Sequence, residues 1–245
     1  MAKLTFLGCG DAFGSGGRLY TCFLLETAGK KILIDCGVSA LISMKKQGVT
    51  PSEIDAIVIS HLHGDHFGGI PFFLLDARYI SRRTKNLIIA GPQNIASRSA
   101  ILSEALYPNS WLADRGFDLE FEEMYAGQTT SLSGVKVIPF PVVHPSGSSS
   151  FGLRIECEGK VLAYSGDTEW TDTLIPLSAQ ADIFVCECYK YDEQLRFHLD
   201  YQTLRANYHQ LSCRKMILTH MGNEMLAKTD ESVFECAFDG MVVEF

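Results

Sequence analysis

Short apolar runs, bounded by glycine or charged residues, recur along the chain and predict β-strands. In the first half they cover Leu4–Leu7, Thr21–Glu26, Lys31–Asp35, Ala56–Ser60, Leu87–Ala90 and Leu119–Met124. In the second half they cover Val135–Pro139, Gly152–Glu156, Val161–Ser165, Ile183–Glu187, Met216–Thr219 and Met241–Glu244. Several of these runs are apolar throughout, which is typical of strands that are buried on both faces.

Apolar residues at helical spacing separate several of these strands. They predict helices over Val38–Gln47, Gly69–Ile80, Gln93–Leu106 and Tyr201–Gln210. No long repeat, charge block or low-complexity linker divides the sequence, so we expect one domain over residues 1–245. Two sheets packed face to face, with helices outside, would bury the apolar strands. The pattern alone predicts an α/β protein with much antiparallel sheet.

Composition narrows the class of protein. A formal net charge of −8 argues against a nucleic-acid-binding surface over the whole molecule. We see neither a signal-peptide pattern nor a run of the roughly 18 apolar residues that a membrane span needs, so we expect a cytoplasmic protein with no membrane partner. Eight cysteines lie mostly in apolar runs without a C-x-x-C pair. Buried free thiols are therefore expected rather than disulfides or a cysteine-type zinc site.

Potential metal ligands are concentrated directly after the run Ala56–Ser60. The segment HLHGDH carries His61, His63, Asp65 and His66, in a chain with only seven histidines. We expect its glycine to let the chain turn, so that Asp65 and His66 face a position next to that of the first two histidines. Imidazole and carboxylate groups suit zinc, and also iron or manganese. Without such a partner, these polar groups at a buried strand end would be costly.

Three further residues of the same kind follow predicted strands. His144 follows VIPFPVV, Asp167 follows LAYSG and His220 follows MILT. One such residue alone would be weak evidence, because turns favour polar residues in any case. The threefold repetition predicts that these side chains converge on one site.

With these ligands in order, the sequence resembles the metallo-β-lactamase superfamily, whose motif H-x-H-x-D-H is matched by HLHGDH. The resemblance covers nearly the whole chain and implies an αββα four-layer sandwich with the site at one edge of the two sheets. It also implies two divalent metal ions, with zinc expected and manganese or iron as alternatives. By that resemblance one metal is held by His61, His63 and His144, the second by Asp65, His66 and His220, and Asp167 bridges them.

Asp35, at the end of ILID, matches an aspartate that orients a metal ligand in the superfamily. A simple turn aspartate is the alternative interpretation.

Two further stretches, LTFLGCGDAFGSGGR and YSGDT, are similar to ribonuclease Z and its relatives. The first is not a dinucleotide fingerprint, because Phe13 occupies the third glycine position; its glycines are expected to build a loop beside the site. Glu187 and His198 match the order of a glutamate and a histidine in that branch. There the histidine, assisted by the glutamate, protonates the leaving group. The alternative for His198 is an exposed histidine at a helix start.

One departure bears on the substrate. Ribonuclease Z enzymes that process transfer RNA carry a long basic arm, which in the bacterial form lies between the ligands matching His144 and Asp167. Here HPSGSSSFGLRIECEGKVLAYSGD fills that interval, and two strands with a hairpin use it up. RNA processing is therefore disfavoured. The chain is more similar to compact relatives such as the cyclic phosphodiesterase of phosphonate metabolism.

We therefore expect a dinuclear metal-dependent hydrolase, a phosphodiesterase acting on a small phosphodiester or cyclic phosphate through a metal-bridging hydroxide that Asp65 orients. The expected partner is a small anionic substrate, and a homodimer is possible because family members are often dimers. The alternative is a carboxylic ester, thioester or lactone hydrolase on the same metals; iron would allow a redox role. The loop Pro145–Ser150 could bind phosphate oxygens or be a plain connector.

Overall fold

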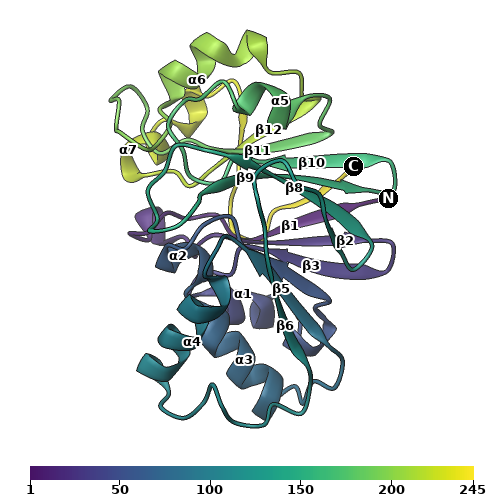
Figure 1. Cartoon of the computed structure of the whole chain (residues 1–245). Coiled ribbons are helices and arrows are strands. Elements are labelled where there is room, and N and C mark those ends of the chain that lie inside the picture. The colour runs from purple at the N-terminus through teal and green to yellow at the C-terminus, as the bar shows by residue number, and fades with distance from the viewer.

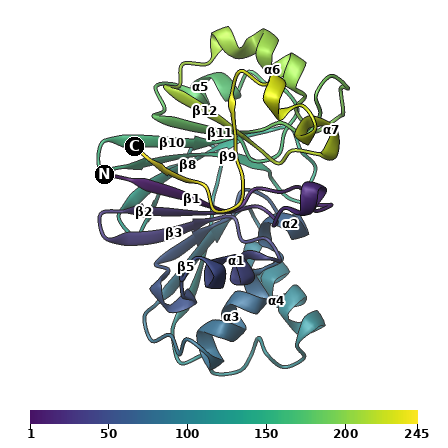
Figure 2. The ribbon, with the colours of Figure 1, turned by 180° about the vertical axis from the view of Figure 1, so that it is seen from behind.

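The computed structural model describes residues 1–245 and shows an αββα sandwich, which confirms the predicted architecture (Figure 1). Two seven-stranded mixed sheets face each other, and helices cover the outer face of each sheet. The two termini lie close together at one edge of the sandwich, as both views of the ribbon show (Figures 1 and 2).

The first sheet has the order β14-β1-β2-β3-β4-β5-β6. Its strands are β1 Lys3–Gly8, β2 Cys22–Thr27, β3 Lys30–Ile34, β4 Ala56–Val58, β5 Leu87–Gly91, β6 Leu119–Glu123 and β14 Val242–Glu244. The helices of this half are α1 Ala40–Lys46, α2 Gly64–Phe67, α3 Ile70–Tyr79 and α4 Ile95–Leu106. The apolar residues of α1, α3 and α4 pack with the outward residues of the sheet in one buried cluster.

The second sheet has the order β13-β12-β11-β10-β9-β8-β7. Its strands are β7 Thr130–Leu132, β8 Val135–Pro141, β9 Phe151–Cys157, β10 Lys160–Tyr164, β11 Ile183–Glu187, β12 Lys215–Thr219 and β13 Glu235–Cys236. The helices of this half are α5 Leu174–Ser178, α6 Tyr201–Asn207 and α7 Asn223–Leu226. They pack on the outer face of this sheet in a separate apolar cluster.

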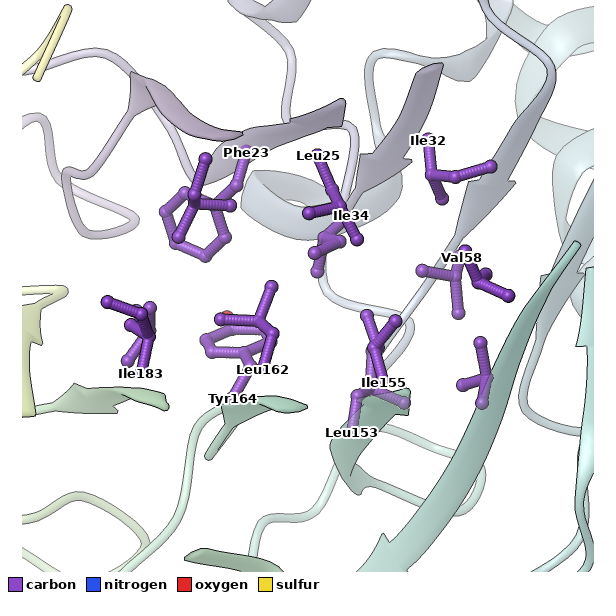
Figure 3. Packing of buried hydrophobic residues seen from close by; sticks show 14 of the residues in the cluster. Phe23, Leu25, Ile32, Ile34, Val58, Leu153, Ile155, Leu162, Tyr164 and Ile183 are labelled. Atoms are coloured by element: carbon purple, nitrogen blue, oxygen red, sulfur yellow. The ribbon is translucent and has the colours of Figure 1, made fainter. Parts of the chain in front are cut away.

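The largest apolar cluster lies between the two sheets (Figure 3). Phe23 and Ile34 of the first sheet face Leu162 and Tyr164 of the second, and the rings of Phe23 and Tyr164 meet edge to face at 5.2 Å. Neighbouring residues of the same strands point to the helices on the other side. Because both faces of each sheet are covered, the strands are apolar at consecutive positions rather than at alternate ones.

The predicted strands are all present, with shifts of a residue or two at their ends. Five short strands and α-helices were not predicted: α2, β7, α5, α7 and β13, each of two to five residues. So few residues carry too little periodicity for a pattern to emerge.

The segment between His144 and Asp167 forms the expected pair of strands, β9 and β10. Glu158 and Gly159 connect them with φ of +48° and +75°. Two positive φ values in a two-residue connection match the twist of the flanking strands and make a tight hairpin. The interval therefore contains no further arm.

All eight cysteines are free, and six of them are buried, as expected from their apolar neighbours. Among the helices, none combines the length and the apolar composition that crossing a membrane would require.

Candidate metal centre and its surroundings

The expected ligands lie at one edge of the sandwich because of how the strands run. Strands β3 and β4 are parallel to each other, and so are β10, β11 and β12. The carboxyl ends of parallel strands meet at the same edge of a sheet. Asp35, His61, Asp167, Glu187 and His220 stand at or just beyond these strand ends. The strand order therefore brings residues that are far apart in the sequence close together in space.

Three imidazoles make up the first group of candidate ligands. One ring nitrogen from each of His61, His63 and His144 lies within 4.8 Å of the others. The closest pair is His144 Nε2 and His63 Nδ1, 2.9 Å apart. This group combines two residues that follow β4 with one that follows β8.

Asp65, His66, Asp167 and His220 form the second group, again within 4.8 Å of one another. The carboxylate of Asp167 lies between the two groups. Its Oδ2 is 3.7 Å from His61 Nε2, 3.3 Å from His66 Nε2 and 3.3 Å from His220 Nε2. The sequence-predicted residues therefore converge, and Asp167 occupies the shared position.

Local structure differs from expectation at the HLHGDH segment. The chain does not turn through a strained glycine; Gly64 has no positive φ and begins α2, a single helical turn. Asp65 and His66 face the site because this turn of helix rotates their side chains toward it. The prediction of a glycine-dependent turn was wrong, since a helical turn reverses the chain without left-handed backbone.

Three polar atoms of the cluster fit bound cations. His61 Nε2, His66 Nε2 and Asp167 Oδ1 are buried and have no hydrogen-bond partner. Leaving such groups unpaired is costly, and a metal ion would satisfy all three. Burial lowers the pKa of His61 well below its usual value, and burial also lowers the pKa of His144 to about 4 although Asp167 opposes it. Both imidazoles are therefore neutral near pH 7, which is the form that ligates metals.

Asp35 forms hydrogen bonds with a candidate ligand of the cluster, rather than acting as a simple turn residue. It is fully buried, with φ of +57°, which is unusual for a residue other than glycine. Its Oδ2 accepts hydrogen bonds from His66 Nδ1 at 2.7 Å and from the Tyr164 hydroxyl at 3.1 Å. The N–H and hydroxyl of Ser60 complete the set at 2.7 and 2.8 Å. This network fixes the orientation of the His66 ring.

His198 lies beside both ligand groups, in the loop before α6. Its Nδ1 is 3.2 Å from Glu187 Oε1, and its ring stacks at 5.7 Å on that of His220. Glu187 is fully buried and also accepts a hydrogen bond from the Thr168 backbone N–H. Although burial lowers it, the pKa of His198 is raised to about 9 because the Glu187 carboxylate stabilises the charged ring more strongly. Such a ring can donate a proton at neutral pH.

Tyr189 is a neighbour of the cluster that the sequence did not reveal. Its ring centroid lies 5.1 Å from that of His198 and 6.3 Å from that of His220. It follows Glu187 by two positions, so alternation along the extended chain was the available signal.

The hydroxyls of the serine-rich loop after His144 form hydrogen bonds within the protein. The hydroxyl of Ser150 donates to the His144 carbonyl at 2.6 Å, and the hydroxyls of Ser146 and Ser150 lie 2.9 Å apart. Ser148 donates to the Gln93 carbonyl at 2.7 Å. These hydroxyls hold the backbone that carries His144. His209, by contrast, is exposed and bonds to the Ala206 carbonyl, away from the cluster.

Comparison with known proteins gives relatives along almost the whole chain. The chain is 29% identical to the uncharacterized protein Rv1339 of Mycobacterium tuberculosis over 249 residues, covering 98% of this chain and 88% of that protein. It is 26% identical to the "probable metallo-hydrolase YhfI" of Bacillus subtilis over 203 residues, 78% of this chain and 74% of the relative.

Solved structures share the fold at lower identity. The crystal structure of the metallo-β-lactamase fold protein YhfI from Bacillus subtilis matches with a TM-score of 0.80 and 21% identity, over 100% of this chain and 99% of that one. A new diphosphatase from the PhnP family gives 0.79 and 21%, over 100% and 98%. Human tRNase Z, short form, gives 0.78 and 23%, over 99% and 98%.

These neighbours show that the chain has the metallo-β-lactamase fold, as the resemblance implied. A single family model spans residues 2–238, and it describes the anti-Pycsar protein Apyc1. The match includes both candidate ligand groups, Glu187 and His198. On this evidence the chain is a member of the anti-Pycsar protein Apyc1 family, built on the metallo-β-lactamase fold.

Proposed function

We propose that this protein is a metal-dependent phosphodiesterase that cleaves a small phosphodiester or cyclic phosphate. The observation that carries the proposal is a histidine–glutamate pair beside the candidate metal centre, in which the histidine would donate a proton. His198 lies within 4.8 Å of ligand atoms of His144 and Asp167, and the buried carboxylate of Glu187 holds its other side. A hydrolase whose leaving group is an alkoxide needs such an acid.

In this proposal the seven ligand residues would hold two divalent ions, zinc first among the candidates, and Asp167, which lies between the two groups, would contribute to both sites. When bound, two such ions supply Lewis acidity at the substrate's oxygens and lower the pKa of water. The chain provides the rest. Asp35 orients the His66 ring. Asp65, whose carboxylate lies 3.2 Å from His66 Nε2, would orient the attacking water.

The leaving oxygen is protonated by His198. Glu187 keeps the ring charged and fixes its rotation, because both carboxylate oxygens lie 3.2–3.3 Å from Nδ1. The opposite ring nitrogen, Nε2, is then the one that donates to the substrate. After cleavage the imidazole regains a proton from solvent, since its side chain is 21% exposed.

Several similar proteins support this chemistry by their names. They include a diphosphatase from the PhnP family, ribonuclease Z enzymes and yeast PDE1. The short β9–β10 hairpin and the net charge of −8 favour a small substrate over transfer RNA.

The test is a parallel assay of the purified protein on bis-p-nitrophenyl phosphate, a thioester and a lactone, each with and without a chelator. We expect chelator-sensitive cleavage of the phosphodiester, restored by adding zinc or manganese. Hydrolysis confined to the thioester or lactone would contradict the phosphodiesterase assignment and favour carbonyl chemistry on the same ligands.

A further inference from the structure

The loop that carries His198 is largely exposed along its length. Residues 192–196 all face solvent. At the base of the loop, the Tyr189 N–H donates to the Leu199 carbonyl at 2.9 Å and so joins its two ends. Directly before His198 comes Phe197, whose backbone is bonded to segments outside the loop. The position of His198 therefore depends on how Phe197 is held.

Phe197 is held at both of its backbone polar groups. Its N–H donates to Glu169 Oε2 at 2.8 Å, and its carbonyl accepts a hydrogen bond from His144 Nδ1 at 2.9 Å. Its φ of +72° is strained for an aromatic residue. Such a conformation persists only where the surroundings impose it. The two hydrogen bonds therefore keep the backbone next to His198 in a conformation that it would otherwise leave.

The carbonyl of Phe197 also sets the tautomer of His144. Because a carbonyl oxygen can only accept a hydrogen bond, His144 Nδ1 carries the proton, and Nε2 is left as the nitrogen that can bind a metal ion. Metal-binding histidines commonly have their other nitrogen fixed in this way. Phe197 is thus bonded to a candidate metal ligand through its carbonyl and covalently to the candidate proton donor.

Glu169 is held in place by its own backbone contacts. It lies two positions after Asp167, and its N–H donates to the Val143 carbonyl at 3.4 Å. The Thr168 hydroxyl donates to the Glu169 carbonyl at 2.7 Å and accepts from the Val143 N–H at 3.0 Å. The half-buried side chain of Glu169 therefore reaches the Phe197 N–H from a fixed backbone.

We propose that Glu169 is a positioning residue that acts through the Phe197 backbone on both His198 and His144. It keeps the candidate proton donor at the cluster and keeps the His144 ring in the orientation that binds metal. For His198 the inference rests on the proposed function, whereas for His144 it rests on the hydrogen bonds alone. Because Glu169 and His198 also line one pocket of 360 Å³, direct contact of Glu169 with substrate is the alternative that the test must separate.

Four variants separate reach from charge. Glu169→Ala removes the acceptor, and Glu169→Asp keeps the charge on a side chain that is one methylene shorter. Glu169→Gln keeps an acceptor oxygen at the original reach without the charge. Glu193→Ala is the matched control, because Glu193 is a 63% exposed glutamate of the same loop.

The first measurement needs no substrate. Hydrogen exchange of the purified protein, followed by NMR at the amides of Phe197 and His198, reports how often this part of the loop opens. We expect exchange about tenfold faster in Glu169→Ala and Glu169→Asp, because the Phe197 N–H loses its acceptor and the strained backbone relaxes. Glu169→Gln and Glu193→Ala should exchange as the wild type does.

The second measurement follows metal binding and turnover. We expect zinc affinity to fall about tenfold in Glu169→Ala, as loss of support behind a metal ligand does. Its kcat should fall more for a poor leaving group than for p-nitrophenolate, while KM changes less than about threefold. Glu169→Gln should restore all of these values. A Gln variant as impaired as the Ala variant would show that the charge is needed at the substrate and would overturn the positioning role.

Wild-type exchange or wild-type zinc affinity in Glu169→Ala would also overturn the proposal. If Glu169→Ala does not fold, Glu169→Asp decides the matter by the same two readouts. A wild-type protein that cleaves no phosphodiester would remove the proposed function. Exchange and zinc affinity would still show whether Glu169 positions the loop and His144.

Discussion

At the scale of single residues, His198 is the side chain that distinguishes a catalyst from a plain metal-binding protein. We predict that His198→Ala lowers kcat by about 100- to 10,000-fold on phosphodiesters with poor leaving groups, because the alkoxide then departs without a proton. The loss should be much smaller for p-nitrophenolate, which needs no acid. Metal content should stay at the wild-type value. An equal loss for both kinds of leaving group would indicate a structural role instead.

Glu187 is predicted to act through His198 rather than on the substrate. In Glu187→Gln the ring is still held in place, but the negative charge that stabilises its protonated form is gone. We expect kcat to fall less than in His198→Ala but with the same dependence on the leaving group. The double variant Glu187→Gln/His198→Ala should have the same kcat as His198→Ala alone. Additive losses in a double-mutant cycle would show that the two residues act separately.

Asp35 is predicted to be as important for stability as for metal binding. Asp35→Ala would leave the hydrogen-bond donors of Ser60, His66 and Tyr164 unpaired in a buried space. Each unpaired group costs about 1–3 kcal/mol, and losing the support of a metal ligand typically weakens metal affinity about 10- to 100-fold. Urea unfolding and zinc titration measure the two effects. Wild-type zinc affinity in this variant would contradict the role assigned to Asp35.

The candidate metal ligands could be identified from the sequence because histidine and aspartate are chemically distinctive and these residues follow apolar runs, as His144 and His220 do. Tyr189 was missed because alternation after β11 was its only signal, and an aromatic residue after a buried strand is normally part of the core. The glycine-rich loop around Phe13 was expected beside the site. Asp11 holds this loop by accepting hydrogen bonds from the backbone N–H groups of Phe13 and Ser15, and only the structure shows this role.

At the scale of elements, the entry into α3 depends on a close approach that sequence does not show. Gly69 precedes α3 at a point where a Cβ would lie 2.2 Å from the Gly37 carbonyl oxygen. Gly64, at the start of α2, has open space around its Cα. The sequence suggested that Gly64 was the glycine the chain needs. Contacts between distant segments, which the sequence does not show, require glycine at Gly69 instead.

We therefore predict opposite outcomes for two alanine substitutions. Gly69→Ala should lower the free energy of unfolding by about 1–3 kcal/mol or more, as overpacking does. Gly64→Ala, the matched control, should leave it unchanged or raise it by up to about 1 kcal/mol, because alanine favours helix. Chemical denaturation of both variants decides the matter, and equal stabilities would contradict this account of α2 and α3.

Long strands and helices were predictable because their apolar periodicity extends over whole elements, as in β9 and α4. Their pairing order was not predictable from the residues. The sandwich was inferred from the family resemblance that HLHGDH indicates. Related proteins share a strand order, whereas the local propensity of the residues does not determine it.

At the scale of the whole molecule, the candidate metal centre joins the two halves of the chain. His61, His63, Asp65 and His66 come from the first sheet's side, whereas His144, Asp167 and His220 come from the second. Metal binding should therefore stabilise the packing of one sheet on the other. A ligand at about 100 times its Kd stabilises by about 2.7 kcal/mol.

We predict that removing metal with a chelator lowers the Tm by several degrees and that zinc restores it. Differential scanning calorimetry of the metal-loaded, chelated and reconstituted protein measures the change. Identical Tm values in all three samples would mean that the cluster contributes nothing to stability, contrary to its position between the sheets.

Metal content per chain decides whether the seven side chains hold two divalent metal ions, as we propose. Elemental mass spectrometry of the purified protein, after reconstitution and gel filtration, should give close to two ions per chain. Asp167→Ala should retain one or none, because Asp167 is shared by both sites. A wild-type protein that retains no zinc, manganese or iron under these conditions would contradict the metal centre and every step built on it.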